Sequence, residues 1–202
     1  MVIRILLADD QALVRGALAA LLQLEGDIDV VAQVGRGDEV LAAARAGEVD
    51  VCLLDIEMPG ADGIEVAERL RAELPAVRSL IVTTFGRPGY VRRALEAGAS
   101  GFVVKDTPAG ELADAVRAVH AGHRVVDPSL AADSLIGGSN PLSEREREIL
   151  RVTLAGEPVA EIARRVHLSQ GTVRNYLSDA IAKTGAANRV GAARTAEAKG
   201  WL

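Results

Sequence analysis

Three acidic residues stand directly after runs that are typical of β-strands. Asp9 and Asp10 follow the apolar run 2–8, and Asp55 follows the run 49–54. If those strands are neighbours in a parallel sheet, their carboxyl ends meet at one edge and the carboxylates converge. Carboxylates this close repel one another unless a cation joins them, and hard oxygen ligands with open positions suit Mg²⁺. A carboxylate at such a site can also act as a nucleophile that accepts a phosphoryl group.

Two further strand ends supply groups that phosphoryl chemistry needs. Thr83 or Thr84 ends a fourth strand and offers a hydroxyl, and Lys105 ends a fifth and offers an ammonium for phosphoryl oxygens. Each residue has an ordinary structural explanation when taken singly: Asp10 can cap the following helix, and Lys105 can be a solvated charge. Their shared position, at the same edge of one sheet, favours a functional site.

The elements that must position these residues can be predicted from hydrophobic periodicity. Five strand–helix repeats with short connections indicate an α/β fold, a doubly wound parallel sheet in which ligands bind beyond the carboxyl ends of the strands. In the order 2-1-3-4-5, the first and third strands are neighbours. The expected strands are 2–8, 28–34, 49–54, 79–84 and 101–105, and the expected helices are 11–24, 38–46, 63–72, 88–97 and 109–121.

The chain changes character after about residue 125. Residues 126–141 contain two prolines and the pair Gly137-Gly138, which indicates a linker with at most one helical turn around 130–135. Beyond it only helical patterns occur. Ser143 and Glu146 form a capping box, and Pro158 suits a first helical position. The expected helices are 143–155, 158–166, 170–184 and 189–199.

Charge divides the chain at the same place. The 202 residues are 49% hydrophobic and 25% charged, with a net charge of −5, an ordinary globular balance. Residues 1–139 carry a net −8 and residues 140–202 a net +3, so the basic part is a candidate for nucleic-acid binding. The single Cys52 lies in an apolar run and suggests a reduced, cytoplasmic protein. The N-terminus becomes charged too soon for a signal peptide, and no apolar run is long enough to span a bilayer, so we expect no membrane insertion.

The basic part contains a helix-turn-helix pattern. One helix ends near Val166, and Ser169 caps the next, whose N-terminal side chains would face base edges in the major groove. Arginine can pair with guanine and asparagine with adenine, whereas a threonine or tyrosine hydroxyl suits phosphate. A solvated helix face is the competing explanation. The candidate DNA-binding residues are Gln170, Thr172, Arg174, Asn175, Tyr176 and Ser178.

The first 120 or so residues resemble a response-regulator receiver domain. The resemblance rests on Asp9-Asp10, on the stretches 53–63 and 82–84, and on 97–106. It implies a CheY-like five-stranded sheet with Asp55 as the phosphoacceptor. It further implies Mg²⁺ held by Asp9, Asp10, Asp55 and the main-chain carbonyl of Glu57, Thr83 with Thr84 as the switch hydroxyls, Phe102 as the coupled aromatic and Lys105 as the phosphate-binding lysine.

The C-terminal segment resembles the small all-α, four-helix DNA-binding domain of LuxR type. Its matching stretches are 142–146, 161–163, 172–176 and 188–189, whereas 183–187 is poorer in apolar residues than the family pattern. A receiver followed by this domain is the NarL/FixJ layout. It divides the chain into a receiver at 1–125, a linker at 126–141 and a DNA-binding domain at 142–202. The stretches 55–60, 83–90 and 171–176 look closest to the desaturase-regulating, DesR-like branch, which implies membrane-lipid genes as targets.

Taken together, the resemblance implies a two-component response regulator and not an enzyme. It would be phosphorylated by a cognate sensor histidine kinase, dimerise, and bind double-stranded promoter DNA, with RNA polymerase a further candidate partner. The residues leave two alternatives open. One is a dimeric transcription regulator that works without phosphorylation. The other is a phosphatase that works through an aspartyl phosphate, which Glu57 disfavours because such enzymes usually place a second aspartate there.

Overall fold

The computed structural model describes residues 2–84, 88–127 and 140–202. These residues form two compact units, an N-terminal α/β unit and a C-terminal helical unit, and each is described by itself. The expected helical turn at 130–135 and most of the expected linker lie outside the described residues.

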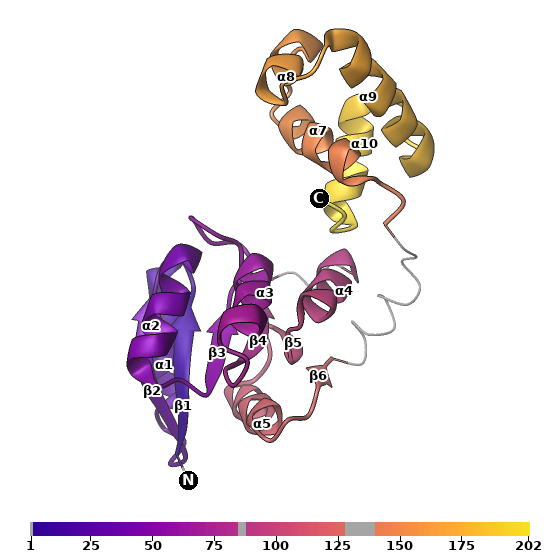
Figure 1. The fold of residues 1–202 in the computed structure, drawn as a ribbon. Coiled ribbons are helices and arrows are strands. Elements are labelled where there is room, and N and C mark those ends of the chain that lie inside the picture. The colour runs from indigo at the N-terminus through magenta and orange to yellow at the C-terminus, as the bar shows by residue number, and fades with distance from the viewer. Residues whose placement is uncertain (1, 85–87, 128–139) are drawn as a thin grey trace. The chain divides into compact units, whose positions relative to one another are not determined.

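A parallel sheet forms the centre of the first unit (Figure 1). Its strand order is β2-β1-β3-β4-β5-β6, so the expected order of the first five strands is confirmed. The central strands β3 and β4 are buried except for Arg78 at the start of β4, as a sheet covered on both faces requires. The strands are β1 (Ile3–Ala8), β2 (Ile28–Val34), β3 (Val51–Leu54), β4 (Arg78–Thr83), β5 (Gly101–Val104) and β6 (Val125–Val126).

The short strand β6 corrects the expected count of five. It pairs in parallel with β5, with Val125 opposite Gly101 and Val126 opposite Phe102. Two valines between an arginine and an aspartate are too short a run to stand out in a sequence pattern, and the strand forms because β5 offers an open edge. The strand also extends the sheet one residue into the expected linker at 126–141.

Helices connect the strands of the α/β unit. Their bounds are α1 (Ala12–Leu22), α2 (Val40–Gly47), α3 (Gly63–Glu73), α4 (Pro88–Ala97) and α5 (Ala109–His120), and a 3₁₀ turn at Gly37–Glu39 precedes α2. The strand expected from Val49 begins only at Val51, because the Val49 amide still donates to the carbonyl of Ala44 at the end of α2. Asp62 caps α3 in a capping box with Glu65.

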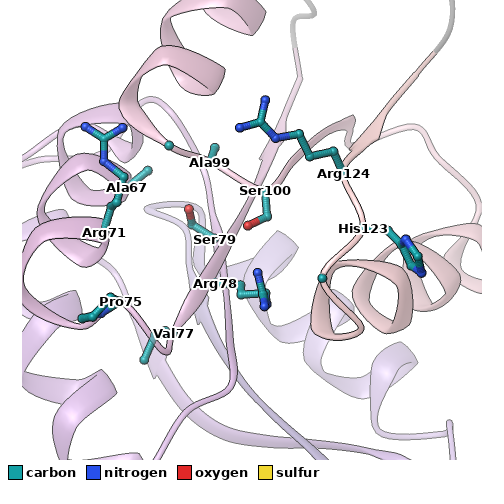
Figure 2. Close-up of a pocket in the computed structure, with 12 residues that line it drawn as sticks. Ala67, Arg71, Pro75, Val77, Arg78, Ser79, Ala99, Ser100, His123 and Arg124 are labelled. Carbon is teal, nitrogen blue, oxygen red and sulfur yellow. The ribbon is translucent and has the colours of Figure 1, made fainter.

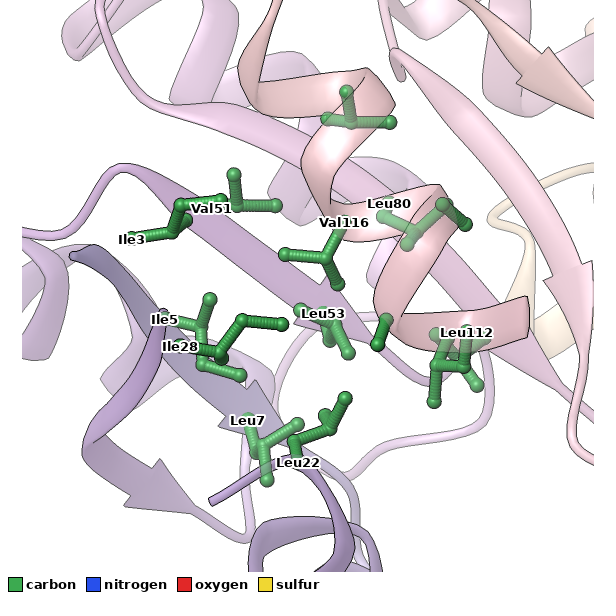
Figure 3. Close-up of a cluster of buried hydrophobic side chains, with 14 of the residues drawn as sticks. Ile3, Ile5, Leu7, Leu22, Ile28, Val51, Leu53, Leu80, Leu112 and Val116 are labelled. Carbon is green, nitrogen blue, oxygen red and sulfur yellow. The ribbon is translucent and has the colours of Figure 1, made fainter. Parts of the chain in front are cut away.

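The core alternates between the two faces of the sheet, as the two-residue period of a strand requires. On β1, Ile3, Ile5 and Leu7 contribute to a core cluster with α1 and α5, whereas Leu6 and Ala8 belong to the opposite face. Figure 3 shows Leu22 of α1 and Leu112 and Val116 of α5 closing over this first face. The packing fixes the strands side by side and so places their ends together.

The helical unit consists of α7 (Glu144–Leu154), α8 (Val159–Arg165), α9 (Gln170–Thr184) and α10 (Arg189–Ala198). The capping box of Ser143 and Glu146 is present. Pro158 was expected at the first helical position, but it is the N-cap, because its ψ of 152° is extended although its φ of −62° suits either position. Apolar side chains from all four helices, with Leu142 and Trp201, form one core.

Candidate functional site

The ends of β1 and β3 bring the two buried aspartates together. Ala8 lies opposite Leu54 in the sheet, and the Asp55 amide donates to the carbonyl of Ala8 at 2.8 Å. Asp9 and Asp55 therefore follow adjacent strand ends, and both are buried, at 3% and 4% exposed. Since the two strands are distant in the sequence, only the sheet register makes these residues neighbours.

Asp9, Asp10 and Asp55 form a cluster whose carboxylate oxygens lie within 4.8 Å of one another. Asp10 is exposed and opens the cluster to solvent. The competing role for Asp10, capping α1, is not seen: Gln11 occupies the cap position, and its amide donates to Asp9 Oδ1 at 2.9 Å. Three hard oxygen donors at this separation, one of them open to water, fit a small divalent cation such as Mg²⁺.

Lys105 bridges the two buried carboxylates. Its Nζ lies 2.7 Å from Asp9 Oδ2 and 2.9 Å from Asp55 Oδ2, with only 7% of the lysine side chain exposed. The amide of Lys105 donates to the carbonyl of Thr83 at 2.7 Å, so the end of β4 positions this residue. Burial disfavours the charged ammonium, but the hydrogen bonds to Asp9 and Asp55 outweigh burial and raise the pKa of Lys105. The lysine is thus a fixed positive charge at the site.

Opposing influences act on the Asp55 carboxyl. Burial raises the pKa of Asp55 above its ordinary value, the hydrogen bond from Lys105 opposes this rise, and the neighbouring Asp9 adds to it. The Ile56 amide also donates to Asp55 Oδ1 at 2.8 Å. Both oxygens of Asp55 are therefore oriented by donors, which holds the carboxylate in one position at the strand end.

The remaining predicted residues of this site lie around the cluster. Thr83 is the buried last residue of β4, and Thr84 follows it, exposed. Phe102 on β5 is fully buried, as ordinary core packing also requires. Glu57 is exposed in the segment after β3.

One residue beside the cluster was missed by the sequence reasoning. The half-buried Arg15 of α1 donates through its Nη1 to the backbone carbonyl of Asp9 and brings a second cation close to the site. A lone arginine on a helix gives no signal of this contact in the sequence. Its position, on the side of α1 that turns back toward the end of β1, depends on how that helix packs.

The second candidate site is the pair α8 and α9. The turn between them contains His167 with a left-handed φ of 54°, and the Leu168 amide donates back to the carbonyl of Ala163 at 3.0 Å. Ser169 then caps α9, and its hydroxyl accepts from the Thr172 amide at 3.1 Å. The expected helix-turn-helix is therefore present, closed by local hydrogen bonds.

The two faces of α9 differ in burial. Val173 and Leu177 face the core, whereas most of the predicted DNA-binding residues face outward. Arg174 Nη2 donates to Gln170 Oε1 at 3.3 Å, so these two side chains act as a pair on the surface. Of the predicted set, Gln170, Arg174, Asn175 and Ser178 are exposed, and Thr172 and Tyr176 are half-buried.

An ion pair between the buried Glu146 and the partly exposed Lys183 ties α7 to α9, and no local pattern in the sequence predicts it. Lys183 Nζ lies 2.8 Å from both carboxylate oxygens of Glu146, whose side chain is 3% exposed. The Ser143 amide donates to the same carboxylate at 2.6 Å. Burial alone would raise the pKa of Glu146, but Lys183 and Ser143 lower it below its ordinary value. The pair holds the predicted recognition helix against the helix that begins the unit.

Comparison with known proteins identifies a family for each of the two units. The response regulator receiver domain family matches residues 5–117, and the bacterial regulatory proteins of the luxR family match residues 140–196. The chain is 46% identical to the uncharacterized transcriptional regulatory protein YvfU of Bacillus subtilis over 200 residues, covering 99% of this chain and 100% of the relative. It is 42% identical to the transcriptional regulatory protein DesR of Bacillus subtilis, covering 99% of each chain.

A solved structure is similar over the full length of this chain. The response regulator ChrA of a heme-sensing two-component system is similar with a TM-score of 0.60 and 33% identity, over 100% of this chain and 99% of that one. The chain belongs to the NarL/LuxR family of response regulators, with a receiver domain followed by a LuxR-type domain. These are families of transcriptional regulators and not of enzymes, which removes the phosphatase alternative. Within the described ranges, every helix is too short or too polar to cross a bilayer.

Proposed function

We propose that this response regulator accepts a phosphoryl group on Asp55 from a sensor histidine kinase and in response binds promoter DNA as a dimer. The domain division that we propose is a receiver at 1–125, a linker at 126–141 and a DNA-binding domain at 142–202. The observation that carries the proposal is the cluster at the strand ends, where Asp55 lies beside Asp9 with Lys105 between them.

The phosphoryl transfer is a displacement at phosphorus. An oxygen of the Asp55 carboxylate forms the new P–O bond, and the P–N bond to the imidazole of the kinase histidine breaks. The imidazole nitrogen keeps the electron pair and takes up a proton. Lys105 contacts Asp55 before transfer and lies within reach of the new phosphoryl oxygens, where it stabilises the added charge of roughly −1.5 to −2.

A Mg²⁺ ion fits this site, with Asp9, Asp10, Asp55 and the main-chain carbonyl of Glu57 as its proposed ligands. When bound, the ion would neutralise the crowded carboxylates and the incoming phosphoryl oxygens. The protein supplies the rest. Lys105 and the Ile56 amide orient the Asp55 carboxylate, and the adjacent strands hold Asp9 beside it.

The proposed switch runs through the ends of β4 and β5. The Thr83 hydroxyl, or that of Thr84, would donate to a phosphoryl oxygen, and Phe102 would repack as the threonine moves. Thr83 lies opposite Val104 in the sheet and accepts from the Lys105 amide through its carbonyl, so the threonine and the lysine share one backbone connection. A charge added at Asp55 would thereby alter the neighbouring surface.

The proposed DNA contacts follow the exposed face of α9. Gln170, Arg174 and Asn175 would read base edges in the major groove, with Ser178 beside them. The hydroxyls of Thr172 and Tyr176 would contact phosphates and position the helix. The resemblance of three stretches to the desaturase-regulating branch supports membrane-lipid genes as targets, and RNA polymerase is the further partner that we propose at such promoters.

A dimer would place two copies of α9 on a two-fold DNA site and double the basic charge. Two leucines on and beside α1 are solvent-exposed in the α/β unit, Leu13 at 87% and Leu24 at 82%. Large apolar side chains left in water support a contact between receivers at this surface. The alternative surface is the face of α4, β5 and α5.

The test is gel filtration of the full chain with acetyl phosphate and Mg²⁺, followed by footprinting on the DNA that flanks its own gene. We expect a shift from monomer to dimer and stronger protection of the DNA, both absent in Asp55→Ala. If the wild-type protein is phosphorylated but stays monomeric, the activation model is wrong. A dimer that forms and protects DNA equally without acetyl phosphate would instead establish the phosphorylation-independent alternative.

A further inference from the structure

A cavity lies at the edge of the sheet where the strands begin, opposite the edge that carries Asp55. It has a volume of about 250 Å³ and is formed where β4 begins, where the chain enters β5, and where it leaves α5 toward β6. Figure 2 shows Arg71, Arg78 and Arg124 on separate walls, with the hydroxyls of Ser79 and Ser100 between them. Since this edge carries the amino ends of the strands, the cavity shares none of its lining with the phosphoacceptor site.

The lining is strongly basic. Three arginines and His123 contribute to it, and none of the described lining residues is acidic. In the described ranges of the chain, the guanidinium groups of Arg78 and Arg124 form no hydrogen bond or ion pair. Like-charged guanidinium groups around one cavity repel one another, and an anion between them lowers this repulsion. The cavity therefore presents two unpaired positive charges and a third from Arg71.

A purely structural explanation accounts for Arg71 alone. Its Nη1 donates at 3.1 Å to the carbonyl of Glu96 at the end of α4, the usual place for a cation beside a helix C-terminus. Its stem crosses Gly98, where an added Cβ would come within 2.4 Å of Arg71 Cδ. These contacts hold the Arg71 guanidinium in place. Its remaining N–H groups can donate to a ligand in the cavity. Among the described residues, no carbonyl accepts from the guanidinium group of Arg78 or Arg124.

Two serine hydroxyls add polar groups to the cavity. Ser79 is only 4% exposed as a residue and contributes to the lining. Ser100 offers a second hydroxyl across the cavity, and Ala67, Pro75 and Val77 form an apolar part of the wall. Both hydroxyls can donate to a ligand that enters the cavity.

We propose that this cavity binds a small ligand that carries at least two phosphoryl charges. Guanidinium groups that approach from three walls suit a tetrahedral oxyanion, whose oxygens point in several directions, better than a planar carboxylate, which one arginine fork satisfies. The two serine hydroxyls supply further donors to the same oxygens. The volume is at the small end of ligand pockets, so the phosphoryl groups would fill most of it.

The test is calorimetric titration of the full chain with sodium pyrophosphate at low ionic strength, with EDTA present to remove divalent ions. We expect one site per chain. Arg78→Ala and Arg124→Ala should each raise the Kd roughly ten-fold or more, as expected for the loss of a charge-assisted hydrogen bond. Ser79→Ala should weaken binding by a smaller factor.

Two variants serve as controls because each removes one exposed arginine elsewhere. Arg45→Ala removes an arginine of α2 that pairs with Glu73. Arg174→Ala removes the arginine of the predicted DNA-binding face, which contacts Gln170. Both should leave the Kd for pyrophosphate within about two-fold, since screened surface charges contribute little. No detectable binding by the wild-type protein, or an equal loss in either control, would overturn the site. Equally tight binding of citrate would overturn its assignment to phosphoryl ligands.

Discussion

The two functional regions of this response regulator are assembled in opposite ways. At the receiver site, Asp9, Asp55 and Lys105 come from three different strand ends, and the last two are 50 residues apart in sequence. On the predicted DNA-binding face, all the residues come from one helix and its cap, within 169–178. The receiver site therefore depends on long-range sheet register, whereas the DNA-binding face depends on helix periodicity and needs the rest of its unit only for support.

The largest effect should come from a substitution at the receiver site, and it should appear in the rate of phosphorylation. Asp55→Asn removes the proposed nucleophile, so we expect phosphorylation by acetyl phosphate to fall at least about 100-fold. Intact-protein mass spectrometry measures the phosphorylated fraction. Asp106→Asn, an exposed aspartate next to Lys105, is the matched control and should be phosphorylated normally. A mutant that is phosphorylated as fast as the wild-type protein would remove Asp55 from its role.

The next largest effect should come from the recognition helix. Arg174→Ala is expected to weaken binding to the footprinted DNA by about 5- to 150-fold, the range of one bidentate arginine–guanine contact, and to relax selectivity at one base pair. Phosphorylation of Asp55 should be unchanged, because the two regions share no residues. Arg194→Ala on α10 is the control, measured in the same band-shift titration. Equal losses in the two variants would mean that α9 does not read bases.

A smaller effect should come from the pair of Glu146 and Lys183, the long-range contact that supports α9. Because the pKa of Glu146 is lowered in the folded protein, its stabilisation is complete above the unfolded pKa of about 4.3 and is lost as pH falls through the lower folded value. Glu146→Gln should cost about 1–2 kcal/mol at pH 7 and flatten the fall in stability below pH 5.

The fluorescence of Trp201 measures this transition selectively, since it is the single tryptophan of the chain and belongs to the helical core. Glu144→Gln, an exposed glutamate on the same helix, should change neither the stability at pH 7 nor its pH dependence. If Glu146→Gln unfolds with the same dependence on pH as the wild-type protein, the ion pair does not stabilise the unit.

The smallest effect should come from the local cap. Ser169→Ala removes the acceptor for the Thr172 amide and is expected to cost about 1 kcal/mol of unfolding free energy in the helical unit. Urea unfolding followed by Trp201 fluorescence gives the value. Ser178→Ala, on the exposed face of the same helix, should change it by less than about 0.5 kcal/mol. A cost as large as that of Glu146→Gln would show that local and long-range supports of α9 contribute equally.

Much of the fold could be predicted from local patterns. Strand β2 and helices α4 and α9 begin and end where periodicity places them, and the caps at Ser143 and Ser169 follow from residue type and spacing. The deviations occur where a distant partner decides. Strand β6 exists because β5 has an open edge, and Val49 stays with α2 because its amide finds the carbonyl of Ala44.

The two sites also differ in how far local sequence patterns predict them. The outward positions of α9 follow from its period, and four of the six predicted residues, Gln170, Arg174, Asn175 and Ser178, are exposed. At the receiver, the order of strands predicts that the aspartates converge, but not that Lys105 joins Asp9 to Asp55 or that Arg15 contacts the Asp9 carbonyl. These contacts depend on side-chain direction at elements packed from far along the chain.

By itself, the sequence determined most of the elements, the caps at Ser143 and Ser169, the division into an acidic and a basic part, and the residues able to do chemistry. Only the tertiary structure decided which of those residues share a site: the lysine between two aspartates, the Glu146–Lys183 pair, and the basic cavity at the opposite edge of the sheet. The physical reason is the distance in sequence over which the interactions act. Helix and strand formation respond to neighbours within a few residues, whereas burial, ion pairing and cavities arise when the packed core fixes distant backbones side by side.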